Sequence, residues 1–316
     1  MADKKIIAVI GSTGAQGGGL ARAIAADRSG GFAGRAITRH PDSDKGKALA
    51  SLGLEVVGAD MDDEASLRRA FAGAHGVFAV TNFWEHLSPE KELAQAGAIA
   101  RAAKGAGVGH VVWSTLEDTR KRVPLSDSRL PTLHEKYKVP HFDAKGEADR
   151  LFAEQGVPTT YLLAAFYWDN FIHFGMGPRK SPDGGAVLAL PLGGGRLPGI
   201  AAGDIGRCAY GIFRRGSEMI GKRVGIAGET LSGPEMAERF SRALGTTVNF
   251  YDMPFDAYRA LGFPGADDLG NMFQYQAIFN DEFCDSRDLA LSRALNPELQ
   301  TFAVWLERNK GAITIA

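Results

Sequence analysis

Short runs of β-branched and apolar residues alternate with longer helical patterns through the first half of the chain. This alternation is typical of βαβ units that build a parallel sheet. The pattern predicts strands near residues 6–11, 35–39, 55–59, 76–81, 110–115 and 159–164. It predicts helices near residues 15–28, 43–52, 64–71, 89–106 and 143–155. The expected fold is α/β, a doubly wound parallel sheet of the Rossmann type.

The rhythm changes after about residue 165. The aromatic stretch FYWDNF comes first, and residues 175–203 are rich in glycine and proline. Helical patterns then return near residues 204–215, 233–243, 268–279, 286–294 and 297–309. We expect a first domain over residues 1–165 and a smaller α/β region over residues 166–316, whose chain interleaves with the first domain.

The composition is that of an ordinary globular protein. The 316 residues, 45% of them hydrophobic, are enough for one large or two modest domains with a buried core. Because 36 basic and 37 acidic residues leave a net charge of −1, no global field attracts nucleic acid or an anionic membrane, and neither is expected as a partner.

Two features bear on the compartment. MADKK leads directly into IIAVIG, and no apolar stretch has the length of a bilayer span, so neither a signal peptide nor a membrane helix is expected. Cys208 and Cys284 lie far apart and lack the spacing of a zinc site or a disulfide framework. Reduced core thiols and a cytoplasmic location are the expectation.

Gly11, Gly14 and Gly17 form a GxxGxxG spacing between the first predicted strand and helix. A dinucleotide site needs this composition for a tight turn, a close approach of the backbone to the pyrophosphate, and helix N–H groups that face the anion. Gly18 and Gly19 are expected to leave the helix start unusually bare. Dinucleotide binding is the favoured interpretation, and an unliganded structural turn is the alternative.

The end of the second strand bears on the choice between NAD(H) and NADP(H). NAD-preferring folds usually place an acidic residue there, whereas this chain has Thr38 and Arg39. A guanidinium pairs well with a 2′-phosphate, so the predicted cofactor is NADP(H), with a contribution from Lys45 or Lys47 left open. Asp62 is expected either to accept from the adenine amine or to cap a helix.

The segment 116–142 is polar, contains three prolines and follows a predicted central strand. We expect it to be a loop over the site rather than a linker, and its order without ligand is left open.

Five motifs carry a family resemblance. VIGSTGAQGGGLAR, TRHPDSDKGKAL, VTNFWE, WSTLED and HFDAKGEADRLFAEQGVP together resemble the NmrA-like group of atypical short-chain dehydrogenases, and within it the HSCARG-type NADPH-sensing proteins. The resemblance spans most of the chain and implies a Rossmann domain with a small α/β substrate domain.

The resemblance also implies roles for individual residues along the cofactor. Thr13, Gly14, Ala15 and Gln16 would meet the pyrophosphate, and Arg39 the 2′-phosphate. Nearer the nicotinamide, the implied contacts come from Val80, Thr81, Asn82, Thr115, Lys145 and Phe166. Among these, Lys145 would reach the ribose hydroxyls and Phe166 would close over the carboxamide.

Typical members of the dehydrogenase superfamily use a Tyr-x-x-x-Lys pair for proton transfer. None of the seven tyrosines here has a lysine four positions later. In HFDAK, His141 stands four residues before Lys145. A histidine can move protons near pH 7, and a histidine that only packs or bonds locally is the alternative. For Lys145, the alternative is an ordinary exposed helix lysine.

Polar residues also follow the fifth strand, at the edge where open α/β sheets bind ligands: Ser114, Thr115, Glu117 and Asp118. Caps and turns are their competing uses. The candidate catalytic residues are therefore Lys145, His141 and Thr115. No HExxH or GxSxG motif is present, so neither a metal nor serine-hydrolase chemistry is expected.

Aromatic residues flank the expected nicotinamide end, where they would line a substrate pocket or form a core between the two regions: Phe83, Trp84, Phe166, Tyr167, Trp168 and Phe171.

Two functions remain in view. The first is an NADP(H)-binding sensor or regulator with weak or no turnover, in which cofactor occupancy changes conformation or association with a partner protein. The second is an NADPH-dependent reductase of a small carbonyl, quinone-like or aromatic substrate that uses Lys145 and His141 in place of the usual pair. The substrate, the partner and the oligomeric state, a homodimer included, are left open.

Overall fold

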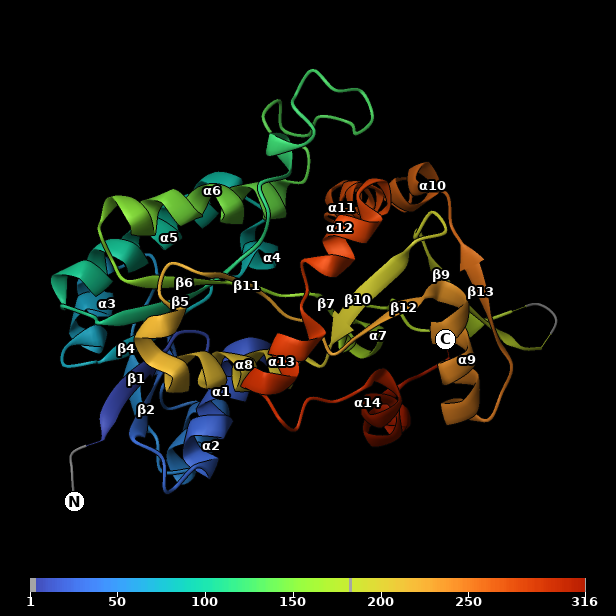
Figure 1. Cartoon of the computed structure of the whole chain (residues 1–316). Helices are drawn as coiled ribbons and strands as arrows, with labels where there is room; N and C mark the ends of the chain where they lie inside the picture. Colours follow the sequence, from blue (N-terminus) through green and yellow to red (C-terminus); the bar gives the residue numbers. More distant parts are fainter. Residues whose placement is uncertain (1–3, 182–183, 316) are drawn as a thin grey trace.

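A seven-stranded, all-parallel sheet forms one part of the molecule (Figure 1). The computed structural model describes residues 4–181 and 184–315, so the first three residues of MADKK lie outside it. In spatial order the strands are β11 (Arg223–Gly225), β6 (Thr159–Leu163), β5 (His110–Thr115), β4 (Gly76–Ala79), β1 (Lys5–Val9), β2 (Phe32–Thr38) and β3 (Glu55–Gly58). The predicted Rossmann-type fold is confirmed, with its switch point between β1 and β4.

Helices cover both faces of this sheet. They are α1 (Ala15–Ala26), α2 (Asp44–Ser51), α3 (Glu64–Phe71), α4 (Phe83–His86), α5 (Pro89–Gly105) and α6 (Pro140–Glu154). All five helices that were predicted for the first half of the chain are present. Helix α6 begins three residues before the predicted start, which places His141 inside its first turn. The short α4 was not predicted.

Alternate residues of the central strands are buried against different helices. Ile7 and Val9 of β1 pack in one cluster with Leu20 of α1. Ala8, between them, belongs to a second cluster with Ile99 of α5. A strand buried on both faces reads as a continuous apolar run, which is why these strands were visible in the sequence.

The second part contains two small mixed sheets. One has the order β12 (Glu229–Ser232), β10 (Arg196–Ile200), β7 (Phe166–Tyr167), and the other β13 (Val248–Asp252), β9 (Ala186–Leu190), β8 (Arg179–Lys180). The helices after β7 are α7 (Asn170–His173), α8 (Ala202–Arg215), α9 (Gly233–Leu244), α10 (Phe255–Arg259), α11 (Ala266–Ile278), α12 (Asn280–Asp285), α13 (Leu289–Leu295) and α14 (Phe302–Asn309). Its strands and the short α7, α10 and α12 were not predicted.

The chain passes back and forth between the two parts. Strand β11 pairs with β6 in the large sheet, and α8 packs on α1. A Cβ on Gly19 of α1 would collide with the carbonyl of Gly203 in α8. Gly19 therefore lets the two helices approach closely, a use that the sequence analysis did not predict.

The loop between β5 and α6 projects beyond α6 in Figure 1 and contains a 3₁₀ helix, η1 (Thr119–Lys121). The fully buried Asp143 carboxylate accepts from the Thr119 N–H at 2.8 Å and the Lys138 N–H at 2.8 Å. The Asn271 amide of α11 donates to the Lys138 carbonyl at 2.6 Å. These bonds fix both ends of the loop, and a position over bound ligand stays a prediction.

Among the described helices, none combines the length and the apolar character needed to cross a bilayer. Cys208 and Cys284 are both buried and free.

Candidate cofactor and active site

The turn after β1 has the geometry of an anion cradle. Gly11 has φ +64°, which strains any residue with a side chain, and a Cβ on Gly17 would lie 2.5 Å from the Gly11 carbonyl oxygen. Helix α1 begins after Gly14 with no side-chain cap and no acidic residue in its first turn. The helix therefore presents uncapped backbone to a ligand, and these residues fit the pyrophosphate of a dinucleotide.

The side chain of Gln16 is engaged elsewhere. Its amide donates to the hydroxyl of Tyr167 in β7, and its Oε1 is buried without a hydrogen-bond partner among the described residues. Burial raises the pKa of Tyr167 to about 12. Contact between the pyrophosphate and Gln16 stays a prediction. Because the Gln16 side chain is engaged, this contact would come from its backbone, as would the predicted contacts of Thr13 and Ala15.

Arg39 follows β2 and forms an ion pair with Glu85 of α4. Arg39 Nη1 lies 2.5 Å from Glu85 Oε1, and Nη2 lies 3.2 Å from Oε2. Both side chains are about half exposed. The hydrogen bond from Arg39 lowers the pKa of Glu85, and the bond to Glu85 raises the pKa of Arg39. Arg39, the residue predicted to bind the 2′-phosphate, is thus paired with a carboxylate that the sequence analysis did not single out.

Asp62 is paired with α5. Its carboxylate accepts from Gln95 Nε2 at 2.9 Å and lies 2.9 Å from Lys91 Nζ, and these two partners lower its pKa. The alternative that Asp62 caps a helix was wrong, because the N-cap of α3 is Asp63. Contact between Asp62 and adenine stays a prediction.

Lys145 of α6 is bound to the segment after β4. Its Nζ donates to the Thr81 hydroxyl at 2.7 Å, to the Thr81 carbonyl at 3.2 Å and to the fully buried carboxylate of Glu92 in α5. The alternative of an ordinary exposed lysine was therefore wrong. Val80 lies against the glycine turn, and Asn82 is the N-cap of α4. The structure thus brings residues 80–82 together with Lys145.

Glu92 was missed in the sequence although a signal existed. It shares one face of the predicted helix with Ala96 and Ile99, at spacings of four and three residues. A carboxylate on an apolar helix face requires a partner. Glu92 also lies 3.6 Å from the Nε2 of His86, whose pKa is lowered by burial.

His141 is paired with a residue from the second part of the molecule. Its Nδ1 lies 2.7 Å from Asp268 Oδ1, and its backbone N–H donates to Asp268 Oδ2 at 3.1 Å. Both side chains are buried. The rings of Trp84 and Phe142 each lie 4.8 Å from the imidazole, and Phe83 lies at 5.9 Å. The hydrogen bond of His141 is therefore long-range rather than local, because α11 supplies the partner, whereas its packing against three aromatic rings agrees with the alternative of a structural histidine. A proton-transfer role for His141 stays a prediction.

The Thr115 hydroxyl has a structural use. It donates to Asp149 Oδ1 at 2.6 Å and lies 3.1 Å from the Lys145 carbonyl, so it ties β5 to α6. A catalytic or nicotinamide role for Thr115 stays a prediction. Of its neighbours, Glu117 pairs with the buried Arg287, and Asp118 caps η1.

The aromatic residues divide into two groups. Phe83 and Trp84 lie beside His141, whereas Trp168 and Phe171 belong to the core of the second part. Phe166 packs on Phe171 at 5.3 Å within that core, and its contact with the carboxamide stays a prediction.

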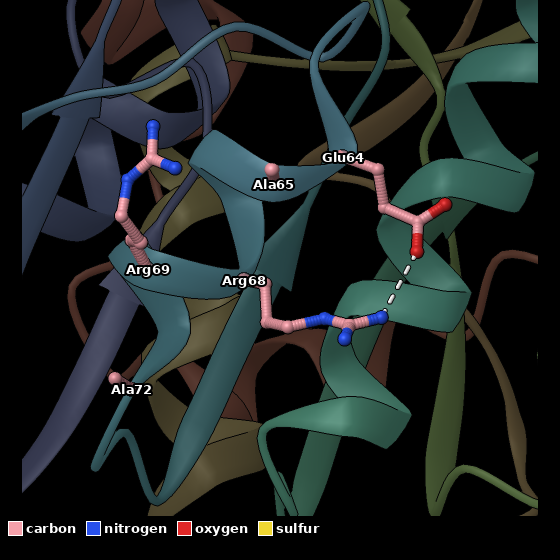
Figure 2. A pocket seen from close by; sticks show the side chains of 5 residues that line it. All are labelled: Glu64, Ala65, Arg68, Arg69 and Ala72. Atoms are coloured by element: carbon pink, nitrogen blue, oxygen red, sulfur yellow. Dashed lines mark hydrogen bonds and ion pairs between the residues drawn. The ribbon is translucent and has the colours of Figure 1, made fainter.

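Figure 2 shows a hollow on the outer face of α3, with Arg68 directed toward Glu64 at 3.3 Å. None of the residues that line it belongs to the candidate site: Glu64, Ala65, Arg68, Arg69 and Ala72.

Comparison with known proteins places the chain in a family. The model of the NmrA-like family matches residues 3–306. The chain is 30% identical over 294 residues to the NmrA-like family domain-containing oxidoreductase FrzB of Cladobotryum sp., which covers 85% of this chain and 83% of that protein. The protein belongs to the NmrA-like family, and this part of the predicted resemblance is confirmed.

Solved structures share the fold. NmrA, a negative transcriptional regulator, in complex with NADP superposes with a TM-score of 0.76 at 24% identity, covering 96% of this chain and 95% of that chain. Triphenylmethane reductase of Citrobacter sp., complexed with NADP(H), gives 0.73 at 20% identity, with 98% and 99% covered. NmrA has also been solved with NAD. NADP(H) is thus bound in two solved structures that share the fold, and NADP(H) binding by this chain stays a prediction.

Proposed function

We propose that this protein is an NADPH-dependent reductase of a planar carbonyl or quinone-like substrate, with His141 as the proton donor. The observation that carries the proposal is the buried pair of His141 and Asp268. It stands at the helix position where the usual tyrosine is missing, four residues before Lys145.

A bound NADPH would supply the hydride for the carbonyl carbon and would become NADP⁺. The residues that would hold it are the glycine turn and Arg39. The reduced oxygen then needs one proton. With Nδ1 directed at Asp268, the Nε2 of a protonated His141 is the nitrogen free to donate, and the carboxylate stabilises the positive ring. Solvent restores the proton after release of the product.

The surroundings of His141 point to the substrate class. Phe83, Trp84 and Phe142 lie around the ring, so an aromatic or quinone-like substrate would stack there with its oxygen toward the imidazole. Trp84 is 39% exposed, which leaves part of this aromatic cluster open to a ligand.

The test combines binding with turnover. Calorimetric titration with NADPH and NADH measures cofactor affinity, and the absorbance of reduced nicotinamide follows its consumption with aldehydes, ketones and quinones. We expect tight NADPH binding and reduction of at least one planar substrate. Tight binding with no turnover across the panel would reject the reductase.

We propose as the second candidate a cofactor-responsive regulator of the HSCARG type, with weak or no turnover. The favouring observation is Lys145, whose ammonium is bound to Glu92 and Thr81. Helix α4 would transmit occupancy, because Glu85 pairs with Arg39 while Trp84 packs on His141. A ligand shifts such an element only if it binds its two states unequally. Hydrogen exchange over residues 83–88 with and without NADPH tests this, and identical exchange would reject it.

A further inference from the structure

We propose that Glu85 sets the preference of the site between NADP(H) and NAD(H) by competing with the 2′-phosphate for Arg39. This inference rests on the proposed dinucleotide function. It assigns a specificity role to a residue of α4 that lies outside the glycine turn and outside the second strand.

The geometry of the pair carries the inference. Both terminal nitrogens of Arg39 face the two carboxylate oxygens of Glu85, at 2.5 and 3.2 Å. This two-point arrangement is the one that a guanidinium also offers to a phosphate. Glu85 therefore holds the donors that a 2′-phosphate would need.

Because both are negatively charged, the Glu85 carboxylate and a 2′-phosphate compete for Arg39. A 2′-phosphate and the Glu85 carboxylate are both anions, and placing like charges side by side costs free energy. Because Glu85 is about half exposed, it can leave Arg39 for solvent when NADP(H) binds. Breaking the Arg39–Glu85 ion pair then costs free energy, and this cost weakens the binding of NADP(H).

NAD(H), in contrast, would interact with Glu85 rather than with Arg39. Its ribose carries a 2′-hydroxyl, which can donate to a carboxylate. The second strand ends without the acidic residue that usually accepts this bond, and Glu85 brings a carboxylate to the Arg39 side chain from α4. With Glu85 paired to Arg39, the affinities for NADPH and NADH should therefore differ less than they would with Arg39 alone.

The experiment compares Glu85→Gln with the wild-type protein by calorimetry, using NADPH, NADH and the nicotinamide-free probe 2′,5′-ADP. We expect Glu85→Gln to bind NADPH and 2′,5′-ADP at least about fivefold more tightly, and NADH no more tightly. Arg39→Ala should weaken NADPH and 2′,5′-ADP. Glu55→Gln is the matched control, because Glu55 of β3 pairs with Arg35 of β2 at 2.7 Å, outside the candidate site.

Two results would reject the inference, and they can be told apart. If the wild-type protein binds NADPH but Glu85→Gln and Glu55→Gln give the same affinities, competition by Glu85 is rejected and the proposed function stands. If the wild-type protein binds neither dinucleotide, the proposed function is rejected, and the inference falls with it.

Discussion

Asp268 holds His141 at two points: one carboxylate oxygen lies 2.7 Å from the imidazole Nδ1, and the other accepts the backbone N–H at 3.1 Å. The two residues are 127 positions apart in the chain. Because Asp268 lies in the first turn of α11 and His141 in the first turn of α6, one carboxylate joins the second part of the molecule to the helix that carries Lys145.

Asp268→Asn tests whether this contact positions the proton donor. The variant keeps the shape but loses the charge and the fixed ring tautomer, so kcat for a reduced substrate should fall by about tenfold or more, with NADPH affinity and KM little changed. Steady-state kinetics across pH measures the effect. Asp267→Asn, on the exposed neighbour, is the control. Equal kcat values for the two variants would contradict the positioning role.

Glu92→Gln tests the buried ion pair with Lys145. Removing one partner leaves an uncompensated ammonium in a mostly buried position, so the free energy of unfolding should fall by about 3 kcal/mol. Urea denaturation measures it. Glu90→Gln changes an exposed residue on the same helix and should alter stability by less than about 0.5 kcal/mol. A Glu92→Gln protein as stable as the control would show that the pair contributes nothing.

Gly19→Ala tests the contact between α1 and α8. The added Cβ would meet the Gly203 carbonyl, so we expect a loss of about 1–3 kcal/mol in the free energy of unfolding. Gly203→Ala is the matched control from the other side of the contact, because its own Cβ would meet nothing within 4 Å. That variant should be neutral or up to about 1 kcal/mol more stable. The opposite order would refute the packing argument.

Because His110 is buried, we expect the protein to lose stability in mild acid. Burial lowers its pKa to about 4, against about 6.5 in the unfolded chain. Between these values the unfolded chain binds a proton that the folded protein does not, so stability falls as the pH falls. From pH 8 to pH 5 this residue accounts for about 2 kcal/mol.

Denaturation of His110→Gln at both pH values checks this. The fall in stability should be about 2 kcal/mol smaller in His110→Gln than in the wild-type protein. His40→Gln, at an exposed position, should behave as the wild type does. An identical fall in all three proteins would remove His110 from the acid response.

The sequence predicted six strands of the large sheet because its central strands are buried on both faces and read as apolar runs. The seventh strand, β11, is only three residues long and was not predicted. The glycine turn was visible because its glycines lie within seven residues of one another, directly after a predicted strand. The second part was harder to predict because strands such as Phe166–Tyr167 and Arg179–Lys180 are only two residues long and carry no period. The partners of the candidate residues were hidden for another reason. Asp268, Glu92 and Glu85 meet His141, Lys145 and Arg39 only after folding, across 127, 53 and 46 positions.

The most direct test of the account is a single-turnover comparison of wild-type protein and His141→Gln, each saturated with NADPH and mixed with the best planar substrate from the panel. Absorbance of the reduced nicotinamide follows the reaction. If His141 donates the proton, the wild-type protein oxidises its bound NADPH, and His141→Gln does so about 100-fold more slowly while binding NADPH equally well. Equal rates for the two proteins, or no oxidation by the wild-type protein with any substrate, would contradict the central claim.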